Sequence, residues 1–112
     1  MAQNQKLIDS LQKVLPGLPD TSKLHVYSDL SWELKNADKK AALDYALKEL
    51  ALAQQLNDPK AIAQGHNDAG IIYYQKGNLA EALKAYQLSL EIRNKLNDKA
   101  LIASSQIGRA HV

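Results

Sequence analysis

The residues of this chain best suited to metal binding or catalysis are its three histidines. None of His25, His66 and His111 has a second histidine one helical turn away, the spacing that presents two ligands to one zinc ion. The chain contains no cysteine, so a thiolate metal site is excluded. His66 and Asp68 form no recognised catalytic pair, and we interpret both as groups on a helix surface or at a helix interface. The sequence therefore predicts no metal site.

Carboxylates, serines and glycines do not indicate catalysis either. Asp29 and Glu33 lie one helical turn apart, but general acid–base chemistry needs a pocket that shifts their pKa values, so we interpret them as a solvated helix face. No base accompanies the serines, and the glycines do not follow a phosphate-loop pattern. We therefore expect a protein that is not an enzyme and needs no cofactor. The alternative, a helical enzyme, would require a turnover that is lost when His66 is substituted.

Composition and charge argue against two further classes of protein, nucleic-acid binders and membrane proteins. The 112 residues are 46% hydrophobic and carry a net charge of +2. Lys35, Lys39 and Lys40 cluster beside acidic Asp38 and Asp44, and the basic residues form no stripe, which disfavours nucleic-acid binding. No apolar run reaches the ~20 residues of a membrane helix, and no signal peptide is recognisable, so we expect no membrane segment in this chain and leave the compartment open.

The strongest pattern in the sequence is an internal repeat with a period of 40 residues. Leu56-Asn57-Asp58 and Ile62-Ala63 recur as Leu96-Asn97-Asp98 and Ile102-Ala103. Such a period is typical of solenoids, in which each unit buries its apolar face only against its neighbours. Apolar spacing and breaker residues predict six helices and no strand, at about 4–15, 20–35, 39–56, 59–76, 79–96 and from 98 onward. Asp20, Thr21 or Ser22 is expected to cap the second helix, Asp58 to cap the fourth ahead of Pro59, and Gly77 to end the fourth. Short linkers make consecutive helices antiparallel.

The second unit resembles a tetratricopeptide repeat (TPR), in the longer variety of about 40 residues. The small and aromatic residues of that pattern recur at the right spacing, with His66 where the family usually has Trp; they are Ala69, Gly70, Tyr73, Gly77, Ala82, Tyr86, Ser89 and Leu90. A weaker first unit places Leu30, Ser31, Leu34, Ala42, Ala46 and Leu50 at the matching positions. The resemblance implies that these residues pack the repeats, with Tyr73 and Tyr86 between adjacent hairpins. The fold we expect is all-α, a right-handed α-solenoid of antiparallel hairpins truncated at its C-terminus.

The resemblance also implies a concave groove lined by the first helix of each hairpin. Matching positions place Gln64, Asn67, Ile71, Tyr74 and Gln75 there in the second unit, and His25, Ser28, Trp32, Lys35 and Asn36 in the first. The alternative is that these are merely exposed helix residues. The Lys/Arg and Asn grip with which some family members hold a terminal carboxylate is not evident, so a chaperone-tail binder is disfavoured. The groove suits an extended or helical protein segment.

We divide the chain into an N-terminal helix and linker (1–20), two hairpins (21–58 and 59–98), the start of a third repeat (99–105) and a tail (106–112). The tail breaks the 40-residue register and matches the in-frame translation of a common sequencing adapter, so we expect it to be an artefact; the alternative is an ordinary frayed terminus.

The expected function is protein–protein interaction through the groove. One alternative is the sensor region of a larger bacterial signalling protein, because residues 19–34 resemble the first repeat of histidine kinases and transcription regulators whose repeats precede a membrane helix. That parent protein would be extracytoplasmic and membrane-anchored. Another alternative is self-association through the exposed last repeat.

Overall fold

The computed structural model describes the backbone of residues 4–107 and the side chains of residues 4–97. Within that range the chain is all-helical and has no strand, as predicted. The elements are α1 (Gln5–Val14), a short 3₁₀ turn η1 (Leu15–Gly17), α2 (Asp20–Leu34), α3 (Lys39–Gln55), α4 (Pro59–Gln75) and α5 (Leu79–Ile107). His111 and most of the predicted tail lie outside the described residues.

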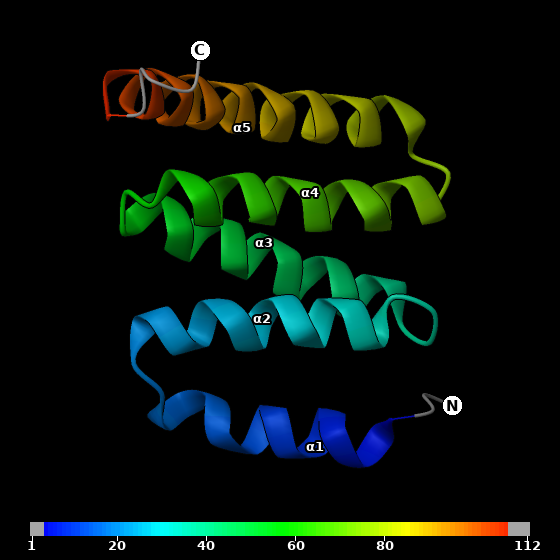
Figure 1. The fold of residues 1–112 in the computed structure, drawn as a ribbon. Coiled ribbons are helices and arrows are strands. Elements are labelled where there is room, and N and C mark those ends of the chain that lie inside the picture. Colours follow the sequence, from blue (N-terminus) through cyan, green and yellow to red (C-terminus); the bar gives the residue numbers. More distant parts are fainter. Residues whose placement is uncertain (1–3, 108–112) are drawn as a thin grey trace.

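Consecutive helices pack side by side in sequence order. Figure 1 shows α1 and α5 at opposite ends of the row, with α2, α3 and α4 between them. In addition to these neighbouring pairs, α2 contacts α4 directly. The radius of gyration, 16.4 Å, exceeds the roughly 13 Å of a compact chain of this length. The molecule is therefore elongated, with extents of 54 × 35 × 25 Å. No helix among the described residues has the length and apolarity to cross a membrane.

The turns after α3 and α4 have the same backbone geometry. Asn57 and Gly77 both take positive φ, at 54° and 82°. The next amide in each turn donates to a carbonyl five residues earlier, Asp58 N to Ala53 O and Asn78 N to Tyr73 O, which is the Schellman arrangement that satisfies the last carbonyls of a helix. The predicted role of Gly77 in ending the fourth helix is confirmed.

Two aspartates begin the next helices in the same way. The carboxylates of Asp38 and Asp58 accept from the amides of Ala41 and Ala61, which confirms the predicted cap at Asp58. The prediction that Asp20, Thr21 or Ser22 caps α2 is wrong. Pro19 is the N-cap residue, no side chain caps this helix, and Asp20 already lies in its first turn.

The predicted sixth helix is also wrong, because α5 continues past Asp98 to Ile107 without a turn. The equivalent Asp58 in the first unit is followed by Pro59, whose ring disfavours helical backbone at the preceding residue. Lys99 replaces that proline in the second unit, so nothing in the local sequence interrupts α5. The start of a third repeat predicted at 99–105 is therefore part of α5.

The core contains large aliphatic side chains from α1, α2 and α4 and small ones from α3. Ile8, Leu30 and Ile72 are at most 1% exposed, and Ala42 and Ala46 are fully buried. Most of the predicted packing residues are buried, namely Leu30, Ser31, Leu34, Ala42, Ala46, Ala69, Gly70, Ala82 and Ser89; Leu50, Tyr73 and Tyr86 are half-buried. Burial of small residues at these positions lets neighbouring helices approach closely.

Two details differ from the predicted packing. A Cβ at Gly70 would lie 2.9 Å from the ring of Tyr86, so Tyr86 packs against α4 of its own hairpin, whereas a position between hairpins was predicted. Leu90 is 59% exposed, although Leu50, the residue 40 positions earlier, is half-buried against Gly65 of α4. No helix among the described residues covers the face of α5 that corresponds to the α4-covered face of α3.

Candidate functional site

The predicted groove residues lie on α2, in the turn that follows it and on α4, and the structure divides them into two neighbouring pockets and a remainder. His25, Ser28 and Gln64 line a large hollow near the start of the two helices. Trp32, Lys35 and Ile71 line a small pocket nearer their ends. Asn36, Asn67, Tyr74 and Gln75 line neither pocket. The structure thus places three of the ten predicted residues at each pocket and four at neither.

The large hollow has a volume of about 860 Å³. Its walls come from four helices, with Thr21 and Leu24 on α2, Glu49 on α3, Lys60, Ala61 and Ala63 on α4, and Arg93, Leu96 and Asn97 on α5; Asp58, the N-cap residue of α4, completes the lining. Lys60 and Arg93 are exposed, whereas Glu49 is only 2% exposed. The hollow therefore combines exposed basic side chains with one buried carboxyl group.

A polar network connects four helices at this hollow. Arg93 of α5 donates from Nη2 to Gln64 Oε1 at 3.3 Å. Gln64 donates in turn to Asp68 Oδ1 at 2.8 Å, and Ser28 of α2 donates to Asp68 Oδ2 at 2.8 Å. Asp68 is 9% exposed and accepts from two side chains, as a buried carboxylate requires. Glu49 adds a fourth helix, because it also lies in contact with Asp68.

Glu49 carries a proton at neutral pH. Burial raises the pKa of Glu49 to about 10, and a side-chain hydrogen bond to Asp68 and the negative charges of Asp68 and Asp29 act in the same direction. The two carboxyl groups thus form a pair in which the protonated Glu49 donates a hydrogen bond to Asp68. Glu49 Oε1 is buried and has no hydrogen-bond partner among the described residues.

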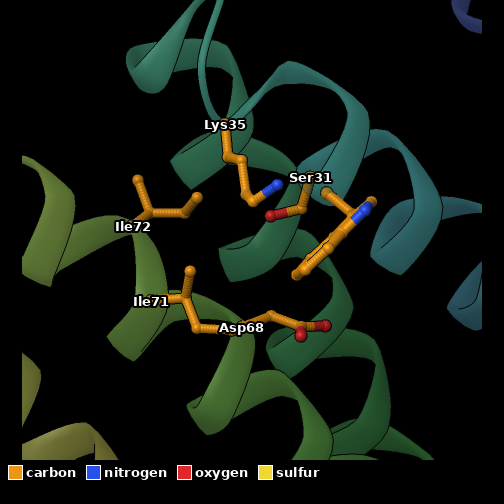
Figure 2. Close-up of a pocket in the computed structure, with 6 residues that line it drawn as sticks. Ser31, Lys35, Asp68, Ile71 and Ile72 are labelled. Atoms are coloured by element: carbon orange, nitrogen blue, oxygen red, sulfur yellow. The ribbon is translucent and has the colours of Figure 1, made fainter.

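The small pocket holds about 10 Å³, enough for one water molecule. Figure 2 shows Ser31 and Lys35 of α2 facing Asp68, Ile71 and Ile72 of α4 across it. The Nζ atom of Lys35 lies 3.6 Å from the centre of the Trp32 ring, a cation–π contact. Trp32 is nevertheless 57% exposed and Tyr74 is 62% exposed, so two large aromatic rings face solvent on the contacting helices α2 and α4.

The histidines do not build a site in the described part of the chain. Burial lowers the pKa of His66, so its ring is neutral at physiological pH. No group of three or more metal-ligating side chains was found among the residues that the structure describes. His25 contributes to the lining of the hollow, and His66 lines neither pocket.

Sequence reasoning missed Glu49 and treated Asp68 only as a surface or interface group. Two features of the sequence indicate that Glu49 occupies a buried position. It continues the stripe of small buried residues on α3 formed by Ala42, Ala46 and Ala53, and it lies 40 positions before Ser89, a predicted packing residue that is 2% exposed. A carboxyl at such a position indicates either a partner group or a bound proton.

Comparison of the chain with protein-family models, with characterised proteins and with solved structures found no match. The resemblance to tetratricopeptide repeats therefore remains a prediction from the residues.

Proposed function

We propose that this chain is a protein–protein interaction module that binds a segment of a partner along the surface formed by α2 and α4. The observation that carries the proposal is the pair of exposed rings of Trp32 and Tyr74 on two helices that contact each other. Aromatic side chains that remain uncovered on rigid helices are typical anchors of protein interfaces. The repeat pattern of the sequence supports the same function.

The mechanism is burial of apolar partner side chains on these rings, accompanied by hydrogen bonds to the amides and hydroxyls around them. Ile71 adds apolar surface between the two helices, and Asn67, half-buried on α4, provides an amide. The neighbouring hollow provides depth for a longer partner side chain. The binding surface therefore carries exposed aromatic rings at one end and the hollow at the other.

An array of overlapping decapeptides, followed by calorimetry on the segments that bind, tests this proposal. Trp32→Ala is expected to weaken binding of a captured segment at least tenfold, as truncation of a central aromatic anchor does, and Tyr74→Ala to weaken it severalfold. Leu47→Ala, at a position that is 40% exposed on α3, is the matched control and should leave affinity unchanged. Failure of every segment to bind, or equal loss in the control, would overturn the proposal.

A second function, self-association, is favoured by a different observation. Leu79, Leu83 and Leu90 of α5 are 60%, 59% and 59% exposed and lie on one stripe of the helix. A leucine stripe of this kind is an apolar surface that a second molecule would cover. Light scattering over a concentration series tests this function separately from peptide binding.

A further inference from the structure

From the buried Glu49 carboxyl that lines the hollow we infer that the hollow receives a basic side chain of the partner segment, whose ammonium or guanidinium group binds Glu49 where it contacts Asp68. This inference rests on the proposed function, since it concerns one residue of the segment bound along α2 and α4. The sequence resemblance implies nothing of the kind, because Glu49 lies on α3, the second helix of its hairpin.

The first argument is the unpartnered oxygen at the inner end of the hollow. Glu49 is 2% exposed and lines the hollow, and its Oε1 accepts no hydrogen bond from the described residues. A buried acceptor without a donor is unfavourable and indicates that a donor is missing. Both oxygens of Asp68, which contacts Glu49, already accept from Ser28 and Gln64, so Glu49 Oε1 is the acceptor that remains for an incoming group. A cationic donor is the complementary ligand.

The second argument is the size and lining of the hollow. A volume of about 860 Å³ far exceeds a single ion, and no cluster of three metal-ligating side chains exists among the described residues. Leu24, Ala61 and Leu96 provide apolar wall. The methylene stem of a lysine or arginine packs on such a wall while its charged end reaches a polar group. The hollow therefore fits a long basic side chain better than a small cation.

The charges at the rim add a second requirement for the partner. Lys60 of α4 and Arg93 of α5 are exposed at the entrance, and Arg93 also donates to Gln64. These cations oppose a basic group at the rim and attract an acidic one, while Asp58 is engaged in capping α4. The complementary segment consequently carries an acidic residue next to the basic residue that enters the hollow.

Binding of a cation at this position changes the protonation of Glu49. The proton held between the two carboxyl groups is favoured by burial and by the nearby negative charges of Asp68 on α4 and Asp29 on α2. A positive charge between the carboxyl groups offsets these effects, so the proton leaves Glu49 for the buffer. Complex formation should therefore release up to one proton per molecule.

The test compares peptides and protein variants. Each segment that binds in the array is resynthesised with its basic residue replaced by glutamine, and both versions are titrated against the wild-type chain, Glu49→Gln and Asp68→Asn. Glu49→Gln keeps the shape and the neutral state that Glu49 has in the free protein. Glu81→Gln, at an exposed position of α5, is the matched control.

We expect the basic version to bind the wild-type chain at least tenfold more tightly than its glutamine version. Glu49→Gln should remove that preference, and Glu81→Gln should retain it. Calorimetry in phosphate and in Tris should show proton release for the wild-type chain and none for Glu49→Gln. Equal affinities of the two peptides, or an unchanged preference of Glu49→Gln for the basic peptide, would overturn this inference. The proposed function would still hold in that case if Trp32→Ala weakened binding. An array without any bound segment would overturn both.

Discussion

Ser28 Oγ donates a hydrogen bond of 2.8 Å to Asp68 Oδ2 and so connects α2 to α4 across 40 residues of sequence. The two helices begin different hairpins, so this bond acts between hairpins. Because its acceptor is a buried carboxylate, it belongs to the stronger class of protein hydrogen bonds. It also fixes the Asp68 carboxylate in contact with Glu49, which lines the hollow.

Ser28→Ala should lower the free energy of unfolding by about 1–2 kcal/mol, because it removes a bond to a charged acceptor that water cannot easily replace. Urea denaturation followed by circular dichroism measures the change. Ser10→Ala is the control, since Ser10 is exposed on α1. If Ser28→Ala lowered the free energy of unfolding no more than Ser10→Ala does, the hydrogen bond would not contribute to stability.

Glu49→Gln should stabilise the protein at neutral pH. In the unfolded chain this carboxyl ionises near its ordinary pKa, whereas in the folded chain burial keeps the pKa of Glu49 at about 10. The contribution of the protonated Glu49 carboxyl to the stability of the folded protein is thus fully present below about pH 4 and is lost as the pH rises toward 10. Glutamine has no proton to lose, so the variant should gain up to about 3 kcal/mol over the wild-type chain at pH 7.

The pH profile distinguishes this explanation from a general packing effect. The difference in unfolding free energy between Glu49→Gln and the wild-type chain should be small at pH 5 and grow through pH 7 to pH 9. Urea midpoints at the three pH values measure it, with Glu81→Gln as control. A difference that does not change with pH would mean that Glu49 is ionised in the folded protein.

Gly70→Ala should destabilise the second hairpin by about 1–3 kcal/mol, because the added Cβ would lie 2.9 Å from the Tyr86 ring and force it away from α4. Thermal unfolding measures the loss. Gly17→Ala is the control, since a Cβ there meets no atom within 4 Å. Equal melting temperatures for the two variants would show that the ring moves without cost.

Leu83→Glu should abolish concentration-dependent association, because a carboxylate in the leucine stripe of α5 would be desolvated by a second molecule. Light scattering from micromolar to millimolar concentration measures the mass. Lys84→Gln changes the net charge by the same amount on another face of α5 and should leave the association unchanged. A wild-type chain that stays monomeric at every concentration would remove the basis for self-association.

The helices themselves followed from local sequence. Asp58-Pro59 and Gly77 act within a few residues of chain, since a cap, a missing amide hydrogen and a positive φ are local properties, and the structure has both turns. One prediction that was transferred from the first unit to the second through the 40-residue repeat was wrong. It predicted a turn at residues 97–98, but the physical cause of the first turn includes Pro59, which the second unit lacks.

The site depended on contacts that no local pattern specifies. The sequence by itself determined an all-helical chain, the turns between α3, α4 and α5, and which residues of α2 and α4 would be candidates for a binding surface. Only the tertiary structure decided that Glu49 of α3 meets Asp68 of α4 and that Arg93 of α5 reaches the same hollow. The reason is that a carboxyl's pKa and partners depend on burial and on charges brought from other helices, and these exist only once the helices have packed.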